Sequence, residues 1–372
     1  MLYKNIKKQI LDDVYKLKPN QRIPSRVELV SRFGVTRTTI ERAISELVGE
    51  GYLYTKGGSG TFVSDLQAIR QRNSQSSQWG VILPNILHDT YPGILRGIED
   101  VASINNINIH VGNTDNNPDK QKQYIKNMIN NSVDGLIIVP SIIEDRDISV
   151  FNEVKDNEIP IVACNRSISG FECPKVLSNN YHGGYLATRH LLQQGYKKIG
   201  FVAGISYSLS IERYKGYLTA LSEMGVTINE DHVHFEEYSS TAVQFDKVNK
   251  IGYKVVKDML LNQDKPEAFF CFDDLIAQGA YYAINDSNLA VGSDIGLVGY
   301  NYNRYICESL PGELTSIDFK AYEIGKAAAN ILLDASSKVG ISNSKTFVIQ
   351  PELQIGGSSK GKTSNKHSAL KN

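Results

Sequence analysis

The stretch WGVILPNILHDTYPGILRGIEDVASINNINIHVG, residues 79–112, predicts the fold of the larger part of the chain. A short apolar run at residues 80–83 is followed by an amphipathic run at 93–105 and a second apolar run at 107–112. Short apolar runs fit buried strands, and the longer run has the periodicity of a helix. Because parallel strands need a long crossover between them, this stretch indicates a β-α-β unit of a parallel sheet.

The same alternation continues and then restarts, so we expect two α/β halves with doubly wound parallel sheets. A helix and a strand are expected next, at residues 120–130 and 135–139. In the second half the expected elements alternate between strand and helix, at residues 198–203, 210–224, 268–272, 274–285 and 296–299.

The 372 residues exceed one ordinary domain, and a polar run, NSQSSQ at residues 73–78, reads as a linker. We therefore expect a small domain at 1–66, a linker at 67–78 and a large domain at 79–357. After residue 357 the chain is almost free of apolar residues, so residues 358–372 are expected to form a disordered tail.

The zero net charge hides an asymmetry. Residues 1–72 hold 13 Lys/Arg against 7 Asp/Glu, about +6, so the rest of the chain carries about −6. A basic small domain suits a polyanionic partner. No membrane-spanning run or export signal is recognised, so a cytoplasmic protein is expected. The four cysteines have no metal-binding or redox spacing and are interpreted as buried, reduced thiols: Cys164, Cys173, Cys271 and Cys307.

The N-terminal domain reads as a helix-turn-helix. Ser25 and Glu28 form a capping box at the start of a short helix, Gly34 permits a tight turn, and Thr36 can cap a second helix. Residues 37–39 begin that second helix away from its apolar stripe, so they can reach DNA. Two strand fragments then flank a glycine-rich turn with Lys56 at its tip, which predicts a β-ribbon wing.

The order of these segments over residues 3–63 resembles the GntR family of winged-helix regulators. The matching segments are residues 22–25, 28–29, 33–40, 42–44, 47, 50–53 and 58–63. The resemblance implies binding to double-stranded operator DNA through Ser25, Arg37, Thr38 and Thr39, with Lys56, Gly57 and Gly58 in or near the minor groove. We also expect DNA contacts from the neighbouring Arg26 and Thr36.

Two positions depart from the family pattern. Glu41 stands where most members have arginine, and Arg26 replaces the usual glutamate after Pro-Ser. Glu41 could accept from a cytosine amino group, which would alter operator preference. A salt bridge from Glu41 to Arg37 or Arg26 is the favoured interpretation.

From residue 79 to about 356 the chain resembles the LacI/GalR regulators and the periplasmic sugar-binding proteins whose fold they share. The matching segments include residues 135–138, 159–162, 179–184, 190–199, 213–217, 273–280, 296–301 and 314–317. The resemblance implies two lobes, at 79–176 plus 319–338 and at 177–318 plus 339–357. Joined to a GntR-type head, the domain is similar to the arabinose repressor (AraR) group, which implies L-arabinose as effector and a homodimer.

The resemblance also implies a sugar site beyond the carboxyl ends of the strands. Guanidinium and carboxylate groups can bind neighbouring sugar hydroxyls, and aromatic faces cover C–H surfaces. The implied contacts are Arg213 and Asp274, then Asn301, Asn165 and Asp273, with Asp89 and Tyr91 from the loop after the first strand. Two alternatives stay open: Asp274 could only cap its helix, and Arg213 could be a structural ion-pair partner.

These features predict a repressor that sugar releases from its operator. Segment 64–78 lacks the pattern of the LacI hinge helix, so we expect the ligand to act on two heads of a dimer through a flexible tether. No catalytic set, metal site or cofactor is expected. A free sugar receptor would need an export signal and no basic head. The alternative is a regulator with another effector: another sugar, a purine or a co-repressor protein.

Overall fold

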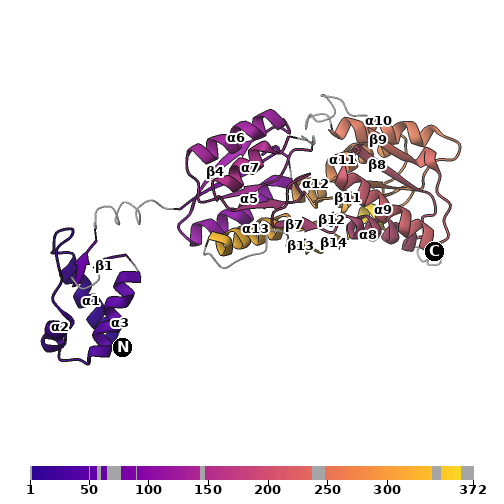
Figure 1. Ribbon diagram of the computed structural model, residues 1–372. Coiled ribbons are helices and arrows are strands. Elements are labelled where there is room, and N and C mark those ends of the chain that lie inside the picture. Colours follow the sequence, from indigo (N-terminus) through magenta and orange to yellow (C-terminus); the bar gives the residue numbers. More distant parts are fainter. Residues whose placement is uncertain are drawn as a thin grey trace. The chain divides into compact units, whose positions relative to one another are not determined.

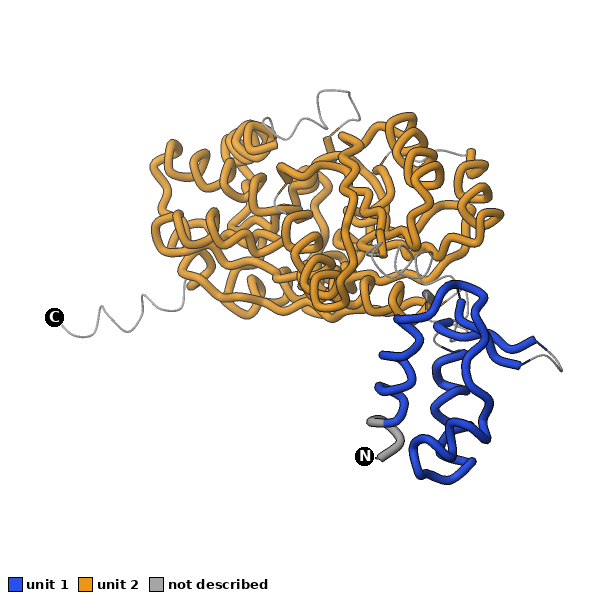
Figure 2. The backbone as a smooth tube through the Cα atoms, turned by 90° about the vertical axis from the view of Figure 1, so that its left-hand side faces the viewer, with its two compact units in different colours: residues 1–76 blue, residues 77–372 orange. Residues whose placement is uncertain are grey.

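The computed structural model divides into two compact units, residues 1–76 and 77–372 (Figures 1 and 2). It describes residues 2–49, 51–56, 60–64, 77–88, 90–142, 147–236, 248–336 and 345–361. Most of the expected linker and the segment assigned to a tether therefore lie outside the described residues. Among the residues described, no helix has the length and apolar character needed to cross a membrane.

The first unit is a helix-turn-helix followed by a β-hairpin. Its elements are α1 (Leu2–Val14), α2 (Arg26–Phe33), α3 (Arg37–Gly49), β1 (Leu53–Lys56) and β2 (Gly60–Val63). Strands β1 and β2 pair antiparallel, as expected for the wing. Ile40, Ile44 and Leu47 of α3 are fully buried against α1, α2 and the hairpin. This apolar stripe orients α3, so its polar face is left on the surface.

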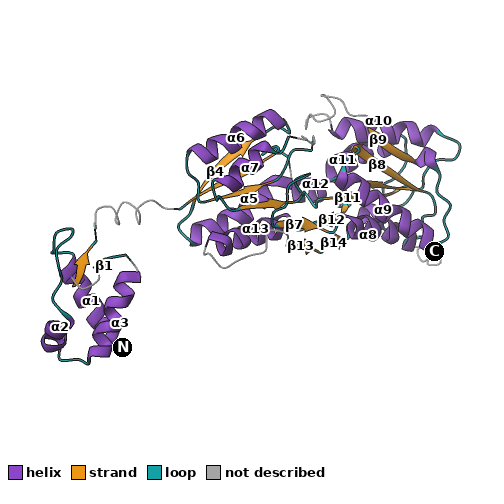
Figure 3. Ribbon diagram, in the orientation of Figure 1, coloured by secondary structure: helices purple, strands orange, loops and turns teal. Residues whose placement is uncertain are grey.

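The second unit consists of two six-stranded sheets with helices on both faces (Figure 3). The first sheet is wholly parallel, in the order β13-β7-β6-β5-β3-β4. Its strands and helices are β3 (Gln78–Leu83), α5 (Thr90–Ile104), β4 (Asn108–Asn113), α6 (Pro118–Asn130), β5 (Gly135–Ile138), α7 (Ser149–Asp156), β6 (Ile161–Cys164), β7 (Lys175–Ser178), α13 (Ala321–Ser336) and β13 (Thr346–Ile349).

The second sheet has the order β14-β12-β11-β10-β8-β9, and only β14 runs antiparallel to its neighbour. Its elements are α8 (Asn180–Gln193), β8 (Ile199–Ile205), α9 (Ser208–Glu223), β9 (Val233–Glu236), α10 (Val248–Leu261), β10 (Ala268–Cys271), α11 (Asp274–Asn285), β11 (Gly296–Tyr300), α12 (Arg304–Ser309), β12 (Thr315–Asp318) and β14 (Glu352–Gln354), with a short 3-10 helix at Gly357–Ser359. The predicted two-lobed α/β fold is confirmed.

Two boundaries of the predicted lobes are wrong. Strand β13 was expected in the second lobe, but it pairs with β7 in the first sheet because its backbone continues the parallel ladder there. The start expected for the tail, residue 358, is also wrong, because Ser358 and Ser359 belong to the short 3-10 helix of the second lobe. Ser358 and Ser359 are buried, and the Ser358 hydroxyl donates to the Leu297 carbonyl at 2.6 Å. Polar side chains here fill hydrogen bonds inside the lobe, which a count of apolar residues does not reveal.

Three pairs of helices cross in close contact through glycines. In α8 and α9, an ideal Cβ at Gly184 would lie 2.1 Å from the Arg213 carbonyl oxygen, and one at Gly216 would lie 2.0 Å from the Tyr181 carbonyl oxygen. Helices α5 and α13 cross in the same way, and so do α10 and α11. Any side chain at these glycines would force the two backbones apart.

Three chain segments join the two sheets, and polar side chains tie them together. Asn179, after β7, donates from its amide to the Gln350 side chain at 3.1 Å. Lys320, after β12, pairs with Asp318 at 3.0 Å and with Glu352 at 2.6 Å. These contacts link the segments at residues 178–180, 318–321 and 349–352, about which the lobes would have to move.

Burial explains the state of the cysteines. All four are buried, and no disulfide joins them. Exclusion from water disfavours the thiolate, so the pKa of Cys164 rises to about 12 and that of Cys173 to about 11. The thiols of Cys164 and Cys173 are therefore protonated at neutral pH.

Candidate functional site

The caps predicted around the helix turn are present in the first unit. The Ser25 hydroxyl accepts from the Glu28 amide at 3.3 Å, and the Glu28 carboxylate accepts from the Ser25 amide at 2.6 Å. Gly34 ends α2 with φ +64°, a conformation that favours glycine. The Thr36 hydroxyl accepts from the Thr39 amide at 3.4 Å. These bonds fix where α3 begins.

The polar face of α3 begins with Arg37 and Thr38, both exposed, and with the half-buried Thr39. Arg37 Nε donates to Glu41 Oε1 at 2.9 Å, and the Arg37 side chain remains 75% exposed. The salt bridge favoured for Glu41 is thus confirmed, with Arg37 as its partner. The bond holds the guanidinium along the helix surface, where it stays accessible.

The other predicted DNA contacts lie on α2 and the hairpin. Arg26 Nη1 donates to the Thr61 hydroxyl of β2 at 3.1 Å, so this side chain links α2 to the wing. Lys56 is exposed at the end of β1. Gly57 and Gly58 lie outside the described residues.

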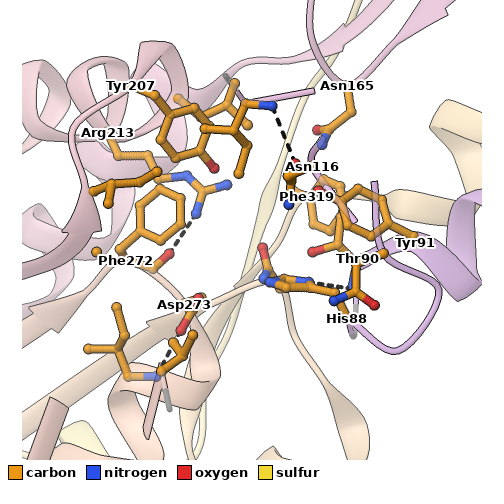
Figure 4. A pocket seen from close by; sticks show the side chains of 18 of the residues that line it. His88, Thr90, Tyr91, Asn116, Asn165, Tyr207, Arg213, Phe272, Asp273 and Phe319 are labelled. Carbon is orange, nitrogen blue, oxygen red and sulfur yellow. Dashed lines mark hydrogen bonds between the residues drawn. The ribbon is translucent and has the colours of Figure 1, made fainter. Parts of the chain in front are cut away.

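In the second unit, a cavity lies between the two sheets, at the ends of their strands (Figure 4). Five of the seven predicted ligand contacts line it: Tyr91, Asn165, Arg213, Asp273 and Asn301. Asp89 lies outside the described residues. Asp274 is described and does not line the cavity.

Arg213 is held in the cavity wall by hydrogen bonds to neighbouring residues. It is only 3% exposed, and its Nε donates to the Asn180 side chain at 2.9 Å. Its Nη1 donates to the Phe272 carbonyl at 2.6 Å. Among the described residues, no carboxylate forms a salt bridge with Arg213, which argues against the ion-pair alternative. Figure 4 shows the guanidinium end directed toward the cavity.

The two neighbouring aspartates have different roles. Asp273 lines the cavity, and its Oδ1 caps α11 by accepting from the Ile276 amide at 2.8 Å. Asp274 is fully buried behind the cavity wall, where its two oxygens accept from the Ser316 hydroxyl and the Asn303 amide, each at 2.6 Å. Asp274 is therefore corrected from a ligand contact to a structural residue that binds strand β12 and the loop after β11.

Asn165 and Asn301 follow β6 and β11 directly, and both have positive φ, +62° and +99°. Asparagine tolerates this backbone region better than most residues. Because both strands end at the cavity, the turns direct these side chains to its wall. An amide at either position can donate one bond and accept another, as a hydroxyl ligand requires.

Sequence reasoning missed several lining residues: His88, Asn116, Tyr207, Phe272 and Phe319. Four of them lie within a few residues of the end of β3, β4, β8 or β10, so the rule that ligands bind beyond strand ends could have identified them. Phe319 follows β12 in the same way. Among the described residues, the wall offers the Arg213 guanidinium, the Asp273 carboxylate, several amides and four Tyr or Phe side chains, a set suited to a small polyhydroxylated ligand.

Comparison with known proteins agrees with both units. Residues 2–63 match the model of bacterial regulatory proteins of the gntR family, and residues 188–359 match the periplasmic binding protein-like domain. The arabinose metabolism transcriptional repressor of Geobacillus stearothermophilus is 26% identical over 364 residues, with 96% of this chain and 97% of that protein covered. The HTH-type transcriptional repressor PurR of Aliivibrio salmonicida is 30% identical over 256 residues, 68% of this chain and 73% of that protein.

Among solved structures, the transcription regulator CcpA of Lactococcus lactis superposes with a TM-score of 0.65 and 25% sequence identity, covering 76% of this chain and 99% of that one. These relatives are transcriptional regulators rather than enzymes. The chain therefore belongs to the helix-turn-helix transcriptional repressors, and it joins a GntR-type DNA-binding domain to a periplasmic-binding-protein-like sensor domain.

Proposed function

We propose that this repressor controls genes for sugar utilisation and leaves its operator when L-arabinose binds in the cavity between the two sheets. The observation that carries the proposal is the wall around Arg213, where a buried guanidinium, the Asp273 carboxylate and two asparagine amides face aromatic side chains. Sugar hydroxyls need such groups because each hydroxyl both donates and accepts.

The choice of L-arabinose rests on the relatives. The protein from Geobacillus stearothermophilus and a second from Halalkalibacterium halodurans, both 26% identical, are named repressors of arabinose metabolism. Both alignments cover more than 90% of this chain, the head included. A different sugar, a purine or a co-repressor protein is the alternative effector, and the test below separates the small molecules.

For DNA binding, we propose contacts from Ser25, Arg37, Thr38 and Thr39 at the turn, with Arg26, Thr36 and the wing at residues 56–58. Exposure of Arg37 and Thr38 and the local positive charge of about +6 support this surface. Dimeric helix-turn-helix proteins bind operators with two half-sites, so we also propose that this repressor is a homodimer. We propose a cytoplasmic location for it, because its proposed partner is operator DNA. Ligand binding would then act by changing how two heads reach paired half-sites.

The experiment uses the full-length protein. Operator sequences are first selected from a random duplex library, and release from the selected DNA is then titrated with L-arabinose in a gel-shift assay. D-Arabinose is the matched control, since it has the same composition and opposite handedness. Release by L-arabinose alone is expected. The sugar assignment would be overturned if a purine released the DNA, or if none of the pentoses and hexoses in a panel did.

A further inference from the structure

A second pocket adjoins the effector cavity, and we call it the side pocket. Its wall includes Arg166 and Ser167 after β6, Ser206 and Ser208 at the start of α9, and Lys122 of α6. Tyr207 and Ile142 line both the side pocket and the effector cavity. A ligand in one pocket would therefore lie next to a ligand in the other.

The side pocket contains a buried cation, Arg166, that forms no salt bridge with any residue the structure describes. Arg166 is 5% exposed. Its Nη2 donates to the Tyr91 hydroxyl at 3.3 Å, while Nε and Nη1 have no hydrogen-bond partner among the residues that the structure describes. A guanidinium is always charged at neutral pH, and burying its charge without acceptors is costly. Arg213, the other buried guanidinium, has acceptors for two of its nitrogens and lies in the effector cavity instead.

The rest of the wall also favours negative charge. Helix α9 begins at Ser208, so the positive end of a 16-residue helix borders the pocket. The exposed hydroxyls of Ser167, Ser206 and Ser208 can donate to an anion. The pocket also contains a carboxylate, Asp147, which pairs with Lys122 at 2.9 Å.

We propose that the side pocket binds an anionic group, a phosphate or a carboxylate, through Nε and Nη1 of Arg166. The anion would be either a separate small ion or the acidic group of an effector that also occupies the neighbouring cavity, such as a sugar phosphate or a sugar acid. The proposal extends the proposed function and rests on it for the adjoining sugar site. It makes the repressor sensitive to an acidic metabolite as well as to a neutral sugar.

The test measures thermal unfolding and calorimetric binding with the full-length protein. Inorganic phosphate is compared with chloride at equal ionic strength, and D-ribose 5-phosphate is compared with D-ribose. Phosphate can also stabilise proteins by exclusion from their surface and can bind the basic head. Both effects are common to all variants, so only the part of the response that depends on Arg166 counts.

Arg166→Gln is expected to weaken anion binding about 10- to 100-fold, because charge-assisted hydrogen bonds are lost. Arg166→Lys, which keeps the charge, is expected to retain part of the response. Arg189→Gln, at an exposed position, is the matched control and is expected to behave as wild type. In chloride, Arg166→Gln is expected to unfold at or above the wild-type temperature, because a buried charge without a partner is removed.

The proposal would be overturned if the wild type and both Arg166 variants responded equally to phosphate, and also equally to ribose 5-phosphate. An Arg166→Gln protein of much lower stability with unchanged anion binding would overturn it as well. Inorganic phosphate that binds without displacing a sugar would identify a separate ion, whereas competition between ribose 5-phosphate and a neutral sugar would identify one acidic effector. If L-arabinose binds and no anion binds, only the side-pocket proposal fails. If an anion binds in an Arg166-dependent way and no sugar binds, only the sugar assignment fails.

Discussion

The guanidinium carbon of Arg213 lies 3.4 Å from the ring centre of Tyr300 and is also stacked on Phe272, at 4.2 Å. A planar cation between two aromatic faces is held in one orientation, and the bonds to Asn180 and to the Phe272 carbonyl fix it further. In the proposed site, this preformed position would let Arg213 bind a ligand without rearrangement.

Arg213→Lys is therefore expected to abolish the ligand response. A lysine ammonium lacks the planar fork and cannot make the same bonds while stacked on both rings. We also expect a loss of about 1–3 kcal/mol in the free energy of unfolding, because buried acceptors lose a charged donor. Calorimetric titration with L-arabinose and chemical unfolding measure the two effects. The exposed Arg189→Lys is the control, and an unchanged dissociation constant in Arg213→Lys would contradict the assigned role.

Gly216→Ala is expected to destabilise the sensor domain by about 1–3 kcal/mol, as overpacked sites do. The added methyl group would lie 2.0 Å from a backbone oxygen of α8, which cannot move aside as a flexible side chain could. Gly49→Ala is the comparison, because a Cβ there meets nothing within 4 Å and alanine is the better helix former. Urea unfolding should separate the two variants; equal stabilities would show that the helix crossing is more tolerant than its geometry indicates.

The stability of the protein is expected to fall below about pH 6.5, partly through His190. Burial lowers the pKa of His190 from its ordinary value of 6.5, so the unfolded chain binds a proton at a higher pH than the folded one. The contribution of His190 to the free energy of unfolding is therefore fully present above pH 6.5, and it is lost as the pH falls toward the lower pKa of the folded state. Urea unfolding between pH 5 and pH 8 measures the slope. His190→Gln should show a flatter profile than wild type, and an identical profile would exclude His190 as a source.

Arg37→Ala should weaken operator binding sharply, whereas Glu41→Gln should strengthen binding to DNA in general. Removing Glu41 takes away a negative charge and frees the Arg37 guanidinium from its partner at 2.9 Å. Gel-shift titrations at several salt concentrations separate the two effects, since a phosphate contact changes the salt dependence by about one unit of slope. Arg304→Ala, an exposed position of the sensor domain, is the control. Operator affinity that survives Arg37→Ala would exclude α3 as the reading helix.

The periodic features of the sequence predicted the fold well. The helix expected at residues 274–285 coincides with α11, and the strand expected at 296–299 lacks only Tyr300. Buried parallel strands and amphipathic helices have hydrophobic patterns that are visible in the sequence, and a cap such as Ser25 with Glu28 involves residues that are close in sequence. Both kinds of signal can be read without knowledge of distant contacts.

Features that depend on distant segments were less accessible. Strand β13 has the pattern of any short strand, and only pairing with β7 assigns it to the first sheet. Asp273 and Asp274 are adjacent and chemically identical, yet only Asp273 lines the cavity. The partners of Asp274 are Asn303, 29 residues away, and Ser316 of β12, 42 residues away. Arg166 was missed for the same reason: two of its buried nitrogens, Nε and Nη1, have no acceptor among the described residues, and no local sequence pattern encodes this.

The buried end of the sensor domain has a practical consequence for protein engineering. The Ser359 hydroxyl is hydrogen-bonded to the His190 ring at 2.8 Å and to the Thr315 hydroxyl at 2.6 Å, so this residue covers buried polar groups of the lobe. A protein truncated at the end of β14 would lack Ser359 and would leave His190 and Thr315 without these hydrogen bonds. Reporter fusions and affinity tags are best appended beyond Gly361, where every one of these contacts is retained.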